Sequence, residues 1–134
     1  MITILKELRT LFLWSLLLVV AWSSIFAAKA VETSFFPVVK DVEITSAIPS
    51  SYKSGISVYL KFTKVRSCEF LKVLWYDKGG NVVPVSFSTN VGTRPPSENE
   101  VGPWHVSIPE LEGSTLYVQH QCHPLWTQFT KMYP

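Results

Sequence analysis

The chain has few cysteines and few charged residues. Two cysteines among 134 residues are too few for a disulfide-dense miniprotein or for a cysteine-rich zinc module. Charged residues make up 16% of the chain, whereas about 25% is usual for a soluble globular domain. Nine prolines and 13% aromatic residues exclude a coiled coil and a disordered tail. The length fits one domain with short additions.

Catalytic motifs are also lacking. The sequence contains no GxSxG, no P-loop, no HExxH and no paired-carboxylate motif. Its serines and threonines fall in predicted strands and turns, without a base placed beside them. We therefore expect no enzymatic activity, no cofactor and no small-molecule substrate.

Basic charge is absent from most of the chain. The formal net charge is +2, but residues 31–134 hold nine basic and nine acidic side chains. Nucleic-acid binding needs a basic stripe that neutralises phosphates, so we expect no nucleic-acid partner. The one basic concentration is interpreted as a solvated strand edge that resists pairing with other strands. It consists of Lys61, Lys64, Arg66 and Lys72.

A long hydrophobic run is present near the N-terminus. Residues 10–28 are 19 consecutive uncharged residues, and as a helix they would reach about 28 Å, close to the hydrocarbon thickness of a bilayer. Lys6 and Arg9 precede the run, and this positive excess predicts a cytoplasmic stub at residues 1–9. The rest of the chain should then cross the plasma (inner) membrane.

Two interpretations of this run stay open. As a signal anchor it is retained, which its length favours because signal-peptide cores usually have 7–15 apolar residues. As a secretory signal it is cleaved after Ala30, where Ala28 and Ala30 are the small residues that cleavage needs. Either way the remaining residues reach a periplasmic or extracytoplasmic space.

After a linker at residues 29–40 the pattern becomes that of strands. Ile56, Val58, Leu60 and Phe62 alternate with polar residues, and residues 67–76 are apolar on both faces, which predicts a strand buried on both sides. Residues 77–81 and 112–114 are expected to close hairpins. We expect an immunoglobulin-like or fibronectin-III-like sandwich of six or seven strands over residues 41–134. The further runs are residues 41–45, 83–87, 104–108, 116–122 and 125–133.

The side chains of greatest chemical interest lie late in the chain. In an oxidising compartment Cys68 and Cys122 are expected to form a disulfide, with a metal-bound or reactive thiol pair as the alternative. His120 and His123 flank Cys122, and His105 could join them from another strand, so a copper or zinc site is a second hypothesis. Strand geometry disfavours this metal site, because His120 and Cys122 share one face of a strand whereas His123 should point to the opposite face.

Two tryptophans next to prolines are candidates for contact with a partner. Trp104 follows Pro103, and Trp126 lies two residues after Pro124. Exposed tryptophans of this kind anchor protein–protein interfaces. The alternative is that both indoles pack under the sandwich.

Three segments together carry a resemblance. They are Arg66-Ser67-Cys68-Glu69-Phe70, Gly102-Pro103-Trp104 and the run from His120 to Trp126. With them the chain resembles a loose group of small membrane-anchored proteins from bacterial and phage genomes. The resemblance implies a single span, an exported β-domain and a cysteine pair, and it transfers no site residue.

These observations favour one function over two others. The first hypothesis is a membrane-anchored envelope protein whose exported sandwich binds another protein, with host-envelope modification as its role if a phage encodes it. The second is a structural subunit of a larger membrane complex. The third is a periplasmic metal-binding protein that uses His105, His120, His123 and Cys122.

Overall fold

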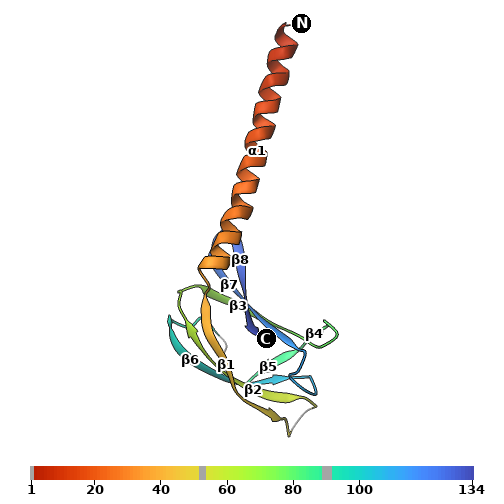
Figure 1. The fold of residues 1–134 in the computed structure, drawn as a ribbon, viewed down its shortest axis with the longest axis vertical. Coiled ribbons are helices and arrows are strands. Elements are labelled where there is room, and N and C mark those ends of the chain that lie inside the picture. Colours follow the sequence, from red (N-terminus) through yellow and green to blue (C-terminus); the bar gives the residue numbers. More distant parts are fainter. Residues whose placement is uncertain (1, 52–53, 89–91) are drawn as a thin grey trace. The chain divides into compact units, whose positions relative to one another are not determined.

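The computed structural model describes residues 2–51, 54–88 and 92–134. The chain forms two compact units that meet between Phe36 and Pro37. The described part of the first unit is one helix, and the second unit holds the strands (Figure 1). The elements are α1 (Ile2–Phe35), β1 (Val39–Pro49), β2 (Ile56–Lys64), β3 (Glu69–Tyr76), β4 (Val82–Val83), β5 (Val85–Phe87), β6 (Ser97–Val106), β7 (Thr115–His123) and β8 (Trp126–Tyr133).

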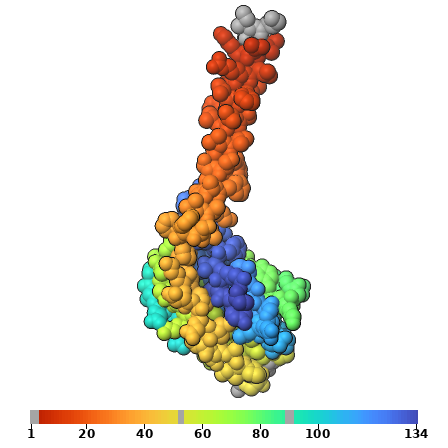
Figure 2. Space-filling model, in the orientation of Figure 1, coloured from red at the N-terminus to blue at the C-terminus, as the bar shows by residue number. Residues whose placement is uncertain are grey.

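Helix α1 has the length and composition of a membrane span. Its 34 residues reach about 51 Å, so it extends beyond the predicted span at both ends and continues through residues 29–35, which we had placed in the linker. The mean hydropathy of its most apolar window is 2.1. Its large apolar side chains, from Ile4 to Phe35, are exposed, and Figure 2 shows the helix as a projection outside the strands' unit. The hydroxyls of Ser23 and Ser24 each donate to the carbonyl oxygen four residues earlier over 2.8 Å, which satisfies them without water.

The strands form an all-β domain of two antiparallel four-stranded sheets. One sheet has the order β1-β2-β6-β5 and the other the order β4-β3-β7-β8. The described residues therefore contain eight strands, where the sequence predicted six or seven. The extra strand arises because residues 83–87 are divided at Pro84, which has no N–H for the ladder. The chain passes there from the second sheet to the first.

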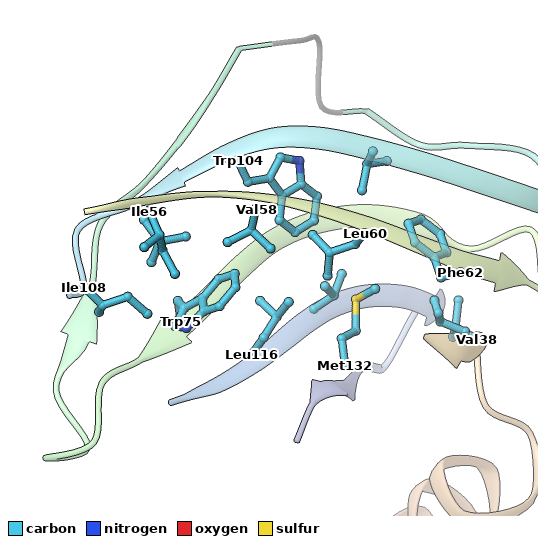
Figure 3. Close-up of a cluster of buried hydrophobic side chains, with 14 of the residues drawn as sticks. Val38, Ile56, Val58, Leu60, Phe62, Trp75, Trp104, Ile108, Leu116 and Met132 are labelled. Carbon is cyan, nitrogen blue, oxygen red and sulfur yellow. The ribbon is translucent and has the colours of Figure 1, made fainter. Parts of the chain in front are cut away.

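The core lies between the two sheets. Alternate residues of β2 point inward, as predicted, and Val58 and Leu60 are fully buried. Trp75 from β3 and Leu116 from β7 meet them from the opposite sheet (Figure 3). Edge strands β1 and β8, from different sheets, lie beside each other at one side of the domain (Figure 2).

Of the two predicted hairpins, one is confirmed and one is corrected. Residues 77–81 join the paired strands β3 and β4. The Asp77 carboxylate accepts hydrogen bonds from the backbone N–H groups of Asn81 and Gly79, at 2.9 and 2.8 Å, which lowers the pKa of Asp77. Residues 112–114 instead lie in the connection between β6 and β7, which belong to different sheets.

Strand β3 is buried on one face only. Its inward residues are Phe70, Val73 and Trp75, since a register shift between Phe70 and Lys72 breaks the simple alternation. Of the outward residues, Leu71 is exposed and Leu74 is half-buried. Among the described residues of this domain, no helix or further sheet covers the outer face of β3, which the sequence predicted to be buried on both sides.

Candidate functional site

The two cysteines are joined at one end of the domain. Cys68 and Cys122 form a disulfide with Cα atoms 4.6 Å apart. The adjacent residues Glu69 and Gln121 are paired in the β3–β7 ladder, so the disulfide extends that ladder by one position. It therefore links neighbouring strands of one sheet, and Cys122 is not a free thiol ligand.

Lys64 lies at the same end and corrects the prediction of a solvated basic edge. Strand β2 is central in its sheet, and Lys64 continues the inward series of Ile56 to Phe62, so only 3% of it is exposed. The outward Lys61 is exposed and pairs with Glu98, whose hydrogen bond and charge raise the pKa of Lys61.

The ammonium group of Lys64 is held by two backbone carbonyls. Its Nζ donates to the carbonyl oxygen of Cys68 over 2.8 Å and to that of Arg94 over 2.7 Å. Burial lowers the pKa of Lys64, because a charged ammonium loses its hydration in the interior. The side chain thus ties the start of β3 and the segment before β6 to the end of β2.

His120 faces the interior from β7. It is 3% exposed and meets Phe70 edge to face, with ring centroids 6.1 Å apart. Burial, aided by the positive charge of Lys64, lowers the pKa of His120 to about 4. The imidazole is therefore neutral at physiological pH. Its Nδ1 atom is buried without a hydrogen-bond partner in the structure.

A cavity of about 40 Å³ lies between the sheets where Lys64 and His120 approach each other. Arg94 and Gly92 also line it, and its remaining walls are apolar and come from both sheets. The apolar side chains are Val39, Phe62, Phe70, Val101, Trp104, Val118 and Met132.

The structure does not bring the predicted metal ligands together. His120 lines the cavity, whereas His123 stacks on Trp126 with ring centroids 3.8 Å apart and accepts a hydrogen bond at Nδ1 from the N–H of Leu125. His105 lies on β6. Over residues 2–51, 54–88 and 92–134, no group of three or more histidine, cysteine or acidic side chains could hold a metal ion.

The two candidate tryptophans have different surroundings. Trp104 is 4% exposed and lies in the core, because inward alternation on β6 directs its indole between the sheets (Figure 3). Trp104 therefore offers no surface to a partner, and the prediction that it contacts one is wrong. Trp126 is half-buried at the β7–β8 turn, beside Leu125, which is 68% exposed.

Sequence reasoning missed a cluster on the outer face of the second sheet, which we name the aromatic face. It comprises Leu74, Tyr76, Tyr117 and Phe129, which line a shallow groove. The two tyrosine rings meet edge to face with centroids 5.9 Å apart, and Leu74 is the ladder partner of Tyr117. The available signal was the second apolar series of residues 67–76, which we had assigned to burial.

Asp77 and Lys78 lie at the rim of the same groove. Tyrosine and phenylalanine with a rim of both charges resemble the composition of protein interfaces more than that of a solvated sheet face. No protein family model matches the chain, and no curated protein or solved structure is detectably similar to it.

Proposed function

We propose that this chain is a single-span envelope protein whose extracytoplasmic β domain binds another protein through the aromatic face. The observation that carries the proposal is that four large apolar or aromatic side chains gather on an uncovered sheet face. Exposed apolar patches of this kind mark interaction sites, and tyrosine is enriched among the residues that dominate binding energy.

The anchor and the disulfide support the topology. Helix α1 exposes apolar side chains on every side, which suits a lipid environment, and its candidate span of 32 residues exceeds a signal-peptide core. A disulfide persists in an oxidising compartment. The length of the helix supports its retention, and the disulfide supports export of the β domain.

We also infer that the domain is of the immunoglobulin type. The orders β1-β2-β6-β5 and β4-β3-β7-β8 correspond to A-B-E-D and C′-C-F-G in such domains, and Trp75 occupies the position of their buried strand-C tryptophan. The disulfide departs from their pattern, since it joins C and F within one sheet instead of B and F across the sandwich. An experimental structure with another strand order would overturn this inference.

Photocrosslinking of the full chain in its native membrane tests the binding proposal. A photoreactive phenylalanine analogue replaces Tyr117 on the aromatic face or, as a matched control, the half-buried Tyr59 on the outer face of β2. We expect a discrete adduct with one protein from position 117 and none from position 59. Equal adducts from both positions, or none from position 117, would contradict the aromatic face as the binding surface.

The topology has its own test. A reporter enzyme that is active only outside the cytoplasm, fused after Pro134, should be active, and denatured protein from membranes should contain no free thiol. Activity of a cytosolic reporter at the same position, together with two free thiols, would overturn the envelope assignment without bearing on the aromatic face.

A further inference from the structure

The turn between β7 and β8 ends in an exposed leucine. His123 at the end of β7 pairs with Trp126 at the start of β8, so Pro124 and Leu125 form the tip of a tight turn. The His123 ring stacks on the indole of Trp126, and its Nδ1 accepts a hydrogen bond from the N–H of Leu125 over 3.2 Å. These contacts order the turn, while the side chain of Leu125 stays 68% exposed.

This turn lies at the end of the domain where the chain enters it. The second unit begins at Pro37, and the carbonyl oxygen of Val38 accepts a hydrogen bond from the N–H of Val65 over 2.9 Å. Val65 lies in the connection between β2 and β3 and is 40% exposed. The same connection ends at Cys68, whose disulfide partner Cys122 is next to the turn. The chain entry, Val65 and the turn therefore share one end of the domain.

The length of the chain keeps this end close to the bilayer. The predicted apolar run ends at Ala28, and helix α1 continues from there to Phe35 over about 10 Å. The head-group layer on one side of a bilayer is about 5–8 Å thick. The domain begins at Pro37, so its entry lies near the outer edge of that layer when α1 spans the membrane. This step rests on the single span of the proposed function.

We propose that the β7–β8 turn is a second membrane-contact site, at which Leu125 inserts into the lipid and Trp126 lies at the level of the head groups. An exposed leucine gains free energy on leaving water, and tryptophan favours the interface because its ring is amphipathic. A protein partner would need a larger contiguous surface than Leu125 and Val65 provide. The contact would fix the orientation of the domain to the membrane, and with it the direction in which the aromatic face points.

Spin-label measurements on the full chain in phosphatidylcholine nanodiscs test this proposal. A nitroxide is attached to Leu125→Cys under non-reducing conditions, which keep the native disulfide closed. The matched control is Ile48→Cys, which replaces an apolar residue that is 53% exposed and lies about 30 Å along β1 from Val39. Leu17→Cys, within the apolar run, gives the value for lipid. Power saturation compares collisions with oxygen, which concentrates in lipid, and with a nickel chelate, which stays in water.

We expect the ratio of oxygen to nickel collisions to be several-fold higher at position 125 than at position 48. A second label separates insertion from simple tethering. With the nitroxide on Val65→Cys, the change Leu125→Asp should lower the ratio, because a carboxylate is expelled from lipid. Ile48→Asp, at the other end of β1, should leave the ratio at position 65 unchanged.

Three results would overturn the proposal. If positions 125 and 48 give equal ratios while position 17 lies in lipid, the turn stays in water, open to a protein partner, and the single span stands. If position 17 is exposed to water as well, the span and the contact site both fail. If position 125 has a high ratio but Leu125→Asp leaves position 65 unchanged, the tether alone holds this end near the bilayer.

Discussion

The indole Nε1–H of Trp75 donates a hydrogen bond to the hydroxyl of Ser114 over 3.0 Å, in a part of the core where both residues are buried. Ser114 in turn donates to the carbonyl oxygen of Leu111 over 2.7 Å. This chain of two bonds connects the end of β3 to the crossover between the sheets. It allows the largest buried side chain of the domain to keep its polar group in the interior.

Replacing Ser114 should therefore destabilise the domain. Ser114→Ala leaves the buried indole N–H without an acceptor, and we expect the free energy of unfolding to fall by about 1–3 kcal/mol. Ser107→Ala, at an exposed position of the same crossover, should change it by less than about 0.5 kcal/mol. Urea unfolding followed by near-ultraviolet circular dichroism measures both. Equal values for the two variants would show that the bond contributes nothing.

The disulfide should supply a large share of the stability. Cys68 and Cys122 are separated by 54 residues, and the loss of loop entropy from the unfolded chain corresponds to about 4 kcal/mol. Adding a reductant should lower the denaturant midpoint of the wild-type chain accordingly. A Cys68→Ala/Cys122→Ala double variant should have the lower midpoint with or without reductant, and a reductant effect on this variant would point to another cause.

Much of the fold could be predicted because each strand's side-chain parity is visible in the sequence. The alternation from Ile56 to Phe62 indicated which side chains of β2 point inward. Lys64 continues the same alternation, which would have predicted that its side chain points inward. We predicted an exposed Lys64 because a lysine is almost never fully buried without a partner, although its place in the alternation indicated burial.

The outer face of β3 could not be assigned from one strand alone. The sequence shows that Leu71 and Leu74 are apolar, but whether another layer covers them depends on the neighbouring strands. The aromatic face, which includes Tyr117 and Phe129, likewise forms only because β3, β7 and β8 lie side by side. Long-range pairing of this kind leaves no local pattern.

Gly102 in β6 should be irreplaceable. Its φ is +134°, and an added Cβ would lie 2.8 Å from Cδ1 of Tyr59 and 2.8 Å from the carbonyl oxygen of Val58. Gly102→Ala therefore combines backbone strain with a clash against backbone, and we expect a loss of about 3 kcal/mol or more.

Gly80 provides the matched control for this effect. Its φ is +80°, but apart from its two chain neighbours no described residue has an atom within 4 Å of the position of an added Cβ. Gly80→Ala should cost about 1–2 kcal/mol from strain alone. Thermal unfolding of the two variants separates the contributions, and equal losses would show that the contact with Tyr59 and Val58 relaxes freely.

The buried histidine should make stability depend on pH. The pKa of His120 is about 4 in the folded chain and 6.5 in the unfolded chain, so between these values only the unfolded state binds the proton. The free energy of unfolding should therefore fall as the pH drops from 6.5 towards 4, by roughly 2–3 kcal/mol from this group, and the contribution should be constant above pH 6.5.

Comparison with a variant isolates this contribution from that of the carboxylates. His120→Gln removes the titrating group, so the difference in stability between wild type and variant should change between pH 6.5 and 4. Chemical unfolding at intervals from pH 4 to 8 measures both chains. A wild-type curve parallel to that of His120→Gln would mean that His120 takes up its proton equally well in both states, which its burial beside Lys64 should prevent.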